Sequence, residues 1–244
     1  METLALFRED AYRRECEAKI VAHSEKGGIV LDRTVFYAAS GGQPGDTGRL
    51  VVPGGGVVPI AATVYAEGSK SEIVHVPASG EPPKLGMPVF AEIAWERRHR
   101  HMRMHTALHL LCSLVPFPVT GGGIAADESR LDFDISEAGV VDKDELTAKL
   151  MALVAADHPV SAHWITDEEL ADNPGLVRTM SVKPPTGTGK VRLVAIGVEG
   201  SVDLQPCGGT HVRSTAEIGG IAVSKIEKKG RQNRRIRLAF ADPP

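Results

Sequence analysis

The sequence predicts an α+β fold in which a small N-terminal β-barrel precedes an α/β domain. Glycine (26) and proline (16) are frequent among the 244 residues and aromatic residues make up 5%, a mixture that favours many short strands and turns. Short apolar stretches fill the first ninety or so residues, whereas a segment without Gly or Pro begins at Trp95. We therefore expect a barrel domain over residues 1–93 and a second domain over residues 94–244.

Apolar stretches of strand length recur through the first part of the chain, and turn-rich segments separate them. Because many short strands otherwise leave exposed edges, a closed barrel is the packing that we expect. The predicted strands are Lys19–His23, Gly28–Leu31, Arg49–Val52, Val57–Val64, Ile73–Val76 and Val89–Ala94.

Helices and strands alternate in the second part. Residues Trp95–Val115 predict a helix that Pro116 ends. Asp142, with Glu145 three residues later, predicts the start of a second helix that runs to about residue 157, and Thr166 opens a short third helix in the same way. A turn is expected at Gly121–Gly123, and strands are expected at Arg130–Ile135, His163–Ile165, Lys190–Ile196, Ile218–Ile226 and Arg234–Phe240.

Composition narrows the class of protein. The hydrophobic share of 42% and the charged share of 24% are typical of soluble globular proteins. A net charge of -3 gives no overall attraction to nucleic acid, so contact with RNA requires a local basic patch. The Lys and Arg residues within 225–237 form one candidate, and a solvated strand edge explains them equally well.

Cellular location follows from what the sequence lacks. It has no run of 18 apolar residues and no signal-peptide pattern at its start. The three cysteines, Cys16, Cys112 and Cys207, show no disulfide framework. We therefore expect a cytoplasmic protein without a membrane partner.

Two pairs of metal-binding residue types lie about a hundred residues apart, each with a spacing of four. His105 and His109 stand one turn apart on one face of the expected helix. Cys207 and His211 flank two glycines, which favour a tight loop. Three imidazoles and a thiolate suit Zn²⁺. The sequence therefore predicts a zinc site, although His101, one turn before His105, offers a different helical pair.

Other catalytic motifs do not fit the sequence. Residues 185–190 look like a phosphate-binding loop, but Pro184 replaces its first Gly and Val191 replaces the Ser or Thr that holds Mg²⁺. We expect a flexible loop there. The helical zinc-peptidase motif requires Glu after the first His, where Thr106 stands. No Gly-x-Ser-x-Gly elbow is present.

A glycine-rich segment, Ala39–Gly48, lies within the expected barrel and contains four glycines in ten residues. Glycines permit positive φ and the close approach of a second backbone. Gln43, Asp46 and Thr47 provide polar groups for a ligand. The segment is either a turn between strands or a ligand-binding loop.

Five segments in order resemble the editing domain of alanyl-tRNA synthetase and its free-standing relatives, the AlaX-type trans-editing proteins. The most family-specific elements are Gly-Gly-Gln at 41–43 and Cys-Gly-Gly-Thr-His at 207–211. The resemblance covers about 200 residues, in the segments Leu31–Gly48, Arg103–Leu111, Arg130–Asp134, Cys207–Val212 with Thr215–Gly219, and Arg234–Ile236.

The resemblance implies an N-terminal barrel that carries the glycine-rich motif and an α/β editing domain that carries zinc. It implies a zinc-dependent aminoacyl-tRNA deacylase that hydrolyses the ester of alanine tRNA charged with serine or glycine. The chain has no room for an adenylation domain, so no ATP is expected. The implied metal ligands and catalytic residues are His105, His109, Cys207 and His211. The implied substrate-binding residues are Gly41, Gly42, Gln43, Asp46, Thr106 and Thr210.

Several points stay open in the sequence. Synthetases of the family often carry a Gln near this turn, whereas this chain has glycines at 121–123. Free-standing members of the family often carry glycines there too. The sequence therefore does not identify the group that places the attacking water. Four protein ligands are the pattern of a structural zinc, whereas a catalytic zinc keeps one position open. Asp46, Asp132 and Asp134 are candidates for a general base. The alternatives are a non-catalytic, zinc-stabilised RNA-binding module and a deacylase for another mischarged tRNA, such as threonine tRNA.

Overall fold

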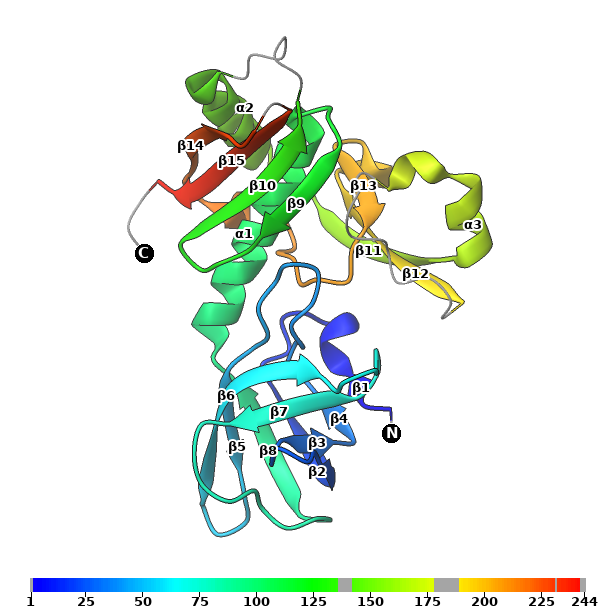
Figure 1. Cartoon of the computed structure of the whole chain (residues 1–244), viewed down its shortest axis with the longest axis vertical. Coiled ribbons are helices and arrows are strands. Elements are labelled where there is room, and N and C mark those ends of the chain that lie inside the picture. The colour runs from blue at the N-terminus through cyan, green and yellow to red at the C-terminus, as the bar shows by residue number, and fades with distance from the viewer. Residues whose placement is uncertain (1, 136–141, 178–188, 231, 242–244) are drawn as a thin grey trace. The chain divides into compact units, whose positions relative to one another are not determined.

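The structure is a computed structural model that describes residues 2–135, 142–177, 189–230 and 232–241. The chain divides into two compact units, Met1–His99 and Arg100–Pro244, which we call the barrel unit and the C-terminal unit. The division falls within helix α1 (Trp95–Leu114), which therefore contributes residues to both. The fold is α+β, as predicted (Figure 1).

The barrel unit contains a closed barrel with the strand order β2-β3-β7-β6-β5-β8. Neighbouring strands are antiparallel, and closure removes the sheet edges. Side chains alternate on β2, where Cys16, Ala18 and Ile20 face the core. All six predicted strands are confirmed, as β2 (Glu15–His23), β3 (Ile29–Leu31), β5 (Gly48–Val51), β6 (Val57–Tyr65), β7 (Ile73–Pro77) and β8 (Pro88–Ile93).

Smaller elements of the barrel unit were not predicted. The strand β1 (Leu4–Ala5) pairs in parallel with β4 (Arg33–Thr34), and a 3-10 turn, η1 (Leu6–Arg8), follows β1. Leu6 and Phe36 join the barrel core. Strands of two residues carry too little periodicity to be read from a sequence.

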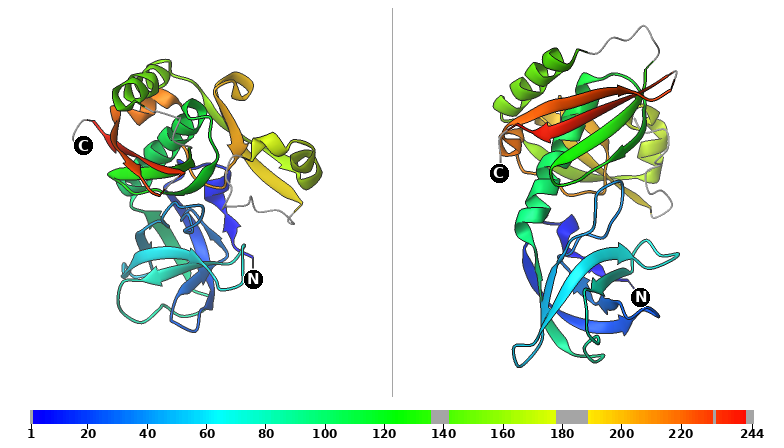
Figure 2. Two further views of the ribbon diagram at one scale, coloured as in Figure 1. Left: turned by 45° about the horizontal axis from the view of Figure 1, so that its top comes forward. Right: turned by 60° about the vertical axis from the view of Figure 1, so that its left-hand side comes forward.

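The first sheet of the C-terminal unit has the order β14-β15-β10-β9 and is antiparallel throughout. One of its faces is buried, and α1 and α2 (Lys143–Ala155) lie along that side of the sheet (Figure 2). Two hydrogen bonds, from Val223 N to Thr147 and from Ile221 N to Met151, join β14 to α2. The strands are β9 (Val119–Gly123), β10 (Glu128–Asp134), β14 (Ile221–Lys228) and β15 (Asn233–Phe240).

A second, three-stranded sheet of the C-terminal unit has the order β11-β12-β13 and is also antiparallel. Its strands are β11 (Val160–Thr166), β12 (Lys190–Ile196) and β13 (Asp203–Pro206). Helix α3 (Asp167–Asp172) follows β11 directly. The described residues of the unit also contain three 3-10 turns, η2 (Pro174–Leu176), η3 (Val198–Gly200) and η4 (Thr215–Ile218).

Both predicted helix starts are confirmed. The side chain of Asp142 accepts a hydrogen bond from Glu145 N, and Thr166 forms a capping box with Glu169. The predicted turn at Gly121–Gly123 is wrong, because these glycines lie in β9 and pair with β10.

The predicted strand Ile218–Ile226 begins only at Ile221, since η4 extends to Ile218, and β13 was not predicted. Residues 185–188 of the predicted flexible loop lie outside the described residues. Among the described residues, no helix combines the length and apolar character that crossing a bilayer requires.

Candidate metal centre

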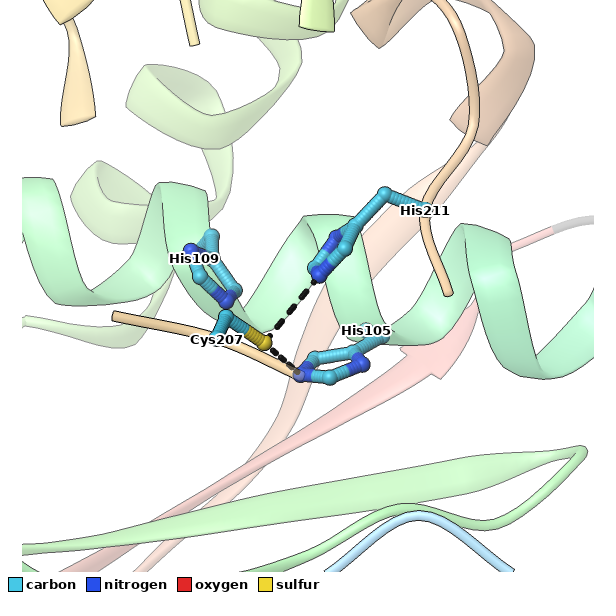
Figure 3. A group of neighbouring side chains, drawn as sticks. All are labelled: His105, His109, Cys207 and His211. Atoms are coloured by element: carbon cyan, nitrogen blue, oxygen red, sulfur yellow. Dashed lines mark hydrogen bonds between the residues drawn. The ribbon is translucent and has the colours of Figure 1, made fainter. Parts of the chain in front are cut away.

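Four side chains of the C-terminal unit converge on one point. His105 and His109 come from α1, and Cys207 and His211 come from the loop after β13 (Figure 3). The Cys207 sulfur lies 3.4 Å from His105 Nε2 and 3.3 Å from His211 Nε2. One ligand atom from each of the four residues lies within 4.8 Å of the other three. The structure therefore brings together the four side chains that the sequence predicted, although they are far apart in the chain.

Asp203 on β13 orients His109. The Nδ1 atom of His109 donates to the Asp203 carboxylate at 2.9 Å, and Gln205 Nε2 donates to the same oxygen at 2.8 Å. Asp203 is almost completely buried, so this contact is shielded from water. The Nδ1 atom of His109 is thus occupied, so a metal would bind its Nε2 atom, which would release its proton to the solvent on metal binding.

Thr106 orients His211 in a comparable way. Its hydroxyl donates to Met102 O at 3.0 Å, so its oxygen accepts from His211 Nδ1 at 3.1 Å and from Val212 N at 3.3 Å. With Nδ1 as the donor, His211 presents its Nε2 lone pair to the cluster. Thr106 is fully buried.

The metal-free electrostatics of the cluster favour a thiolate. Burial raises the pKa of the Cys207 thiol, but His105 and His109 beside it outweigh burial and hold that pKa well below its ordinary value. Burial lowers the pKa of His109, but Asp203 and Cys207 raise it to about 10. Burial and His105 hold the pKa of His211 well below its usual range, so this imidazole is neutral.

The donor set fits zinc. A tetrahedral zinc with nitrogen and sulfur ligands places its ligand atoms about 3.5 Å apart. The two measured sulfur–nitrogen distances of 3.4 and 3.3 Å agree with that spacing. A carboxylate behind one ligating imidazole and a hydroxyl behind another are typical supports of metal ligands. His101 is not part of the cluster, so the His105–His109 pair is the one that the fold uses.

The loop that carries Cys207 is held by β12. Cys207 N donates to Arg192 O at 3.0 Å, which extends the pairing of β12 with β13 by one residue. The Arg192 side chain donates from Nη1 to the carbonyl oxygens of Cys207 and Gly209, at 2.9 and 3.0 Å. These contacts fix the first half of the turn between Cys207 and His211.

Comparison with known proteins identifies the family. Two family models match, "Threonyl and Alanyl tRNA synthetase second additional domain" over residues 191–237 and "tRNA synthetases class II (A)" over residues 3–97. The chain is 35% identical to the alanyl-tRNA editing protein AlaX-M of Methanosarcina mazei, over 98% of this chain and 97% of that protein. The chain belongs to the alanyl-tRNA editing protein family.

A second editing protein and a ligase show the extent of the likeness. AlaX-M of Methanosarcina acetivorans is 36% identical over 98% of this chain and all of that protein. The alanine–tRNA ligase of Pyrobaculum arsenaticum is 35% identical over 93% of this chain, but the match covers 25% of the ligase. The chain thus corresponds to a whole editing protein of this family and to a quarter of a ligase.

The glycine-rich motif of this editing protein forms a tight turn in the barrel unit. Gly41 and Gly42 are exposed and have φ values of 56° and 81°. Gln43 is buried, and its backbone pairs with Ser40. A Cβ at Gly45 would lie 1.9 Å from Thr63 O, so this position requires glycine. The role of Gly41, Gly42 and Gln43 in substrate binding stays a prediction.

Asp46 is also buried, and its carboxylate faces Arg98 of α1. Arg98 Nε donates to both carboxylate oxygens, at 3.0 and 2.9 Å, and Tyr37 N donates to one of them at 2.7 Å. Arg98 also donates to Val35 O and Ala11 O. These contacts hold the glycine-rich turn in place within the barrel unit, so we infer a structural role for Asp46.

Two other predicted substrate-binding residues, Thr106 and Thr210, lie beside the metal ligands and are buried. The contacts of Thr106 serve His211, and its role toward substrate stays a prediction. Asp132 pairs with Arg235 at 2.7 Å on β15, and this hydrogen-bonded guanidinium lowers the pKa of the carboxyl group. A carboxylate held in that way is a poor base, which weakens the proposal that Asp132 accepts a proton.

Four of the basic residues within 225–237 form ion pairs along the sheet, Lys225, Lys229, Arg235 and Arg237. Arg237 bridges Glu227 and Glu128, at 2.7 and 2.6 Å, and Lys225 and Lys229 also contact Glu227. The bonds from Arg237 and Lys225 lower the pKa of Glu227 to about 2. Because the carboxylates of Glu128, Glu227 and Asp132 balance part of this positive charge within the sheet, the structure supports the interpretation of a solvated sheet surface for these paired residues.

Sequence reasoning missed three residues around the metal cluster, Asp203, Gln205 and Arg192. None of them belongs to a motif with a known metal spacing. Asp203 and Gln205 precede Cys207 by four and two residues, so a strand ending at the Cys would have placed all three on one face. That strand, β13, was not predicted.

Proposed function

We propose that this chain is a zinc-dependent aminoacyl-tRNA deacylase that acts in trans on alanine tRNA charged with serine or glycine. The observation that carries the proposal is the cluster of His105, His109, Cys207 and His211, within a chain that matches editing proteins over their whole length. The names of these relatives supply the substrate class, since they are alanyl-tRNA editing proteins.

The chain's own residues prepare the site for a metal. Asp203 and Thr106 hold the Nδ1 atoms of His109 and His211, so that the Nε2 atoms face Cys207. Arg192 fixes the carbonyl groups of the loop. The chemistry that zinc supplies when bound is Lewis acidity, which polarises an ester carbonyl or lowers the pKa of water.

Selection against alanine follows from hydrogen bonding in such a pocket. A pocket that only measures size separates serine from alanine poorly, because the two differ by one hydroxyl group. A pocket that bonds the serine hydroxyl leaves a buried polar group unpaired when alanine enters, and that unpaired group costs binding.

The test is deacylation of alanine tRNA charged with serine, glycine or alanine, with and without a chelator. We expect hydrolysis of the seryl and glycyl esters, loss of activity with chelator, and its return with zinc. His105→Ala should lose both zinc and activity. His163→Ala is the matched control, because His163 is exposed on β11 and lies outside the cluster. Full activity of metal-free His105→Ala would refute the role of the metal.

Two observations each favour a different alternative function. The set of four protein ligands is also the pattern of a structural zinc, which fits an RNA-binding module without catalysis. A stable complex with seryl-tRNA and no turnover would favour that module. One matching family model is described as threonyl and alanyl, so the panel should include threonine tRNA charged with serine. Faster hydrolysis of that substrate than of seryl-alanine tRNA would assign the enzyme to threonine tRNA.

A further inference from the structure

Three residues lie in one row across the second sheet. Trp164 on β11 is the register partner of Arg192 on β12. Leu193 is the partner of Pro206, and Cys207 N bonds to Arg192 O, so Cys207 follows as the next position of the row. Figure 1 shows the three strands side by side. Adjacent strands lie about 4.8 Å apart, so the Trp164 and Cys207 backbones are separated by roughly 10 Å.

The row lies on the face of the sheet that carries the metal centre. Side chains alternate along a strand, so Asp203, Gln205 and Cys207 share a face, and the hydrogen bond that Asp203 accepts from His109 shows that this face meets His109. Register partners point to the same side, which places Arg192 and Trp164 on that face as well.

Burial changes along this face. Val194 and Ile196 on β12 are buried, Arg192 is half-buried, and Trp164 is 49% exposed. The face therefore emerges into solvent at Trp164, next to the loop that holds Cys207. Burial of an indole is strongly favourable, so an exposed one at the margin of a site offers contact area to a ligand.

We propose that Trp164 forms a stacking platform for the base of the 3′-terminal nucleoside of the tRNA, a proposal that rests on the proposed deacylase function. The ester to be cleaved is attached to the ribose of this nucleoside, so the base lies one ribose away from the reacting carbonyl. Single-stranded RNA ends are recognised by stacking on aromatic side chains. The guanidinium of Arg192 between Trp164 and Cys207 adds positive charge beside the nucleotide.

The kinetic test compares Trp164→Ala and Trp164→Phe with the wild-type protein on serine-charged alanine tRNA. Because stacking on an aromatic ring holds the base, Trp164→Ala should raise KM about tenfold with little change in kcat, and Trp164→Phe should stay close to wild type. Bound zinc should be unchanged in both. Phe90→Ala is the matched control, since Phe90 is an exposed aromatic of the barrel strand β8.

The binding test uses fluorescence and does not depend on turnover. The chain has two tryptophans, so a Trp95→Phe variant leaves Trp164 as the sole indole. Two uncharged RNA minihelices of the alanine acceptor stem serve as probes, one ending in CCA and one truncated to CC. We expect the CCA probe to quench Trp164 fluorescence and to bind about tenfold more tightly than the CC probe.

Several results would overturn the platform. An unchanged KM in Trp164→Ala, equal quenching by the two minihelices, or a KM in Trp164→Phe as high as in Trp164→Ala would each do so. Dissociation of an oligomer by Trp164→Ala, with KM unchanged, would assign the indole to a protein contact. If the wild-type protein hydrolyses no charged tRNA while the CCA preference persists, the proposed function fails and the platform stands.

Discussion

Buried histidines occur in both units of the molecule, and they differ in one respect. In the barrel unit, His75 Nδ1 donates to Ile29 O at 3.0 Å and His75 Nε2 accepts from the Thr34 hydroxyl at 2.7 Å. Both ring nitrogens are satisfied within the protein. In the C-terminal unit, His109 and His211 each use Nδ1 and turn Nε2 toward Cys207. Burial alone therefore does not mark a candidate metal ligand, whereas Nε2 atoms that converge on a thiol do.

The most severe test of this difference removes the thiolate. Cys207→Ala leaves three imidazoles, and the lost ligand should weaken zinc binding by roughly 3–4 kcal/mol, about 10²–10³-fold. Zinc affinity measured by competition with a chromophoric chelator checks the value. Cys16→Ala, in the barrel core, is the control and should bind zinc as the wild type does. Equal affinity in the two variants would show that Cys207 is not a ligand.

The barrel unit should be most sensitive at its buried ion pair. Asp46→Asn leaves the charge of Arg98 without its buried counterion, and the free energy of unfolding should fall by about 3 kcal/mol. Urea denaturation followed by circular dichroism measures the loss. The double variant Asp46→Asn with Arg98→Met should recover part of it, because no unpaired charge then remains. A single variant as stable as wild type would contradict a structural role for Asp46.

The buried His75 should make the stability of the protein depend on pH. Burial lowers the pKa of His75 to about 4 in the folded protein, below the ordinary value of 6.5. As the pH falls, His75 of the unfolded chain binds a proton before His75 of the folded protein does. The neutral His75 therefore contributes its full share of stability above about pH 6.5, and this share is lost progressively between about pH 6.5 and pH 4. We expect a loss of about 2 kcal/mol between pH 7 and pH 5.

Urea denaturation at the two pH values measures this effect. His75→Asn keeps a donor for Ile29 O but does not titrate, so its stability should depend less on pH by that amount. If wild type and variant lose the same free energy between pH 7 and pH 5, the shift does not come from His75.

The smallest effect on zinc affinity is expected at Asp203, which supports the candidate ligand His109. Asp203→Asn keeps an oxygen for His109 Nδ1 but removes the negative charge, and zinc affinity should fall about tenfold. Glu199→Gln, an acidic residue of the nearby turn η3, is a matched control for the loss of charge. If the Asp203 variant binds zinc with wild-type affinity, its carboxylate does not support the ligand.

These two regions also show what the sequence can predict. The six barrel strands, α1 and the helix caps follow from local apolar patterns and capping residues, and the structure confirms them. Gly121–Gly123 was predicted as a turn because glycine favours turns locally, but pairing with β10 decides its conformation. The four candidate metal ligands were predicted because their spacing is regular, whereas Asp203 and Arg192 act only through tertiary contacts.

The low pKa of the Cys207 thiol has a consequence for the metal-free protein. Cys16 is buried, and burial raises its pKa, so it stays a protonated and unreactive thiol. A thiolate is the form that peroxides attack, and oxidation beyond the sulfenic acid is irreversible in most proteins. If the cluster holds a metal, its loss would leave a thiolate that peroxides can attack, and the bound ion would protect the sulfur as well as position it.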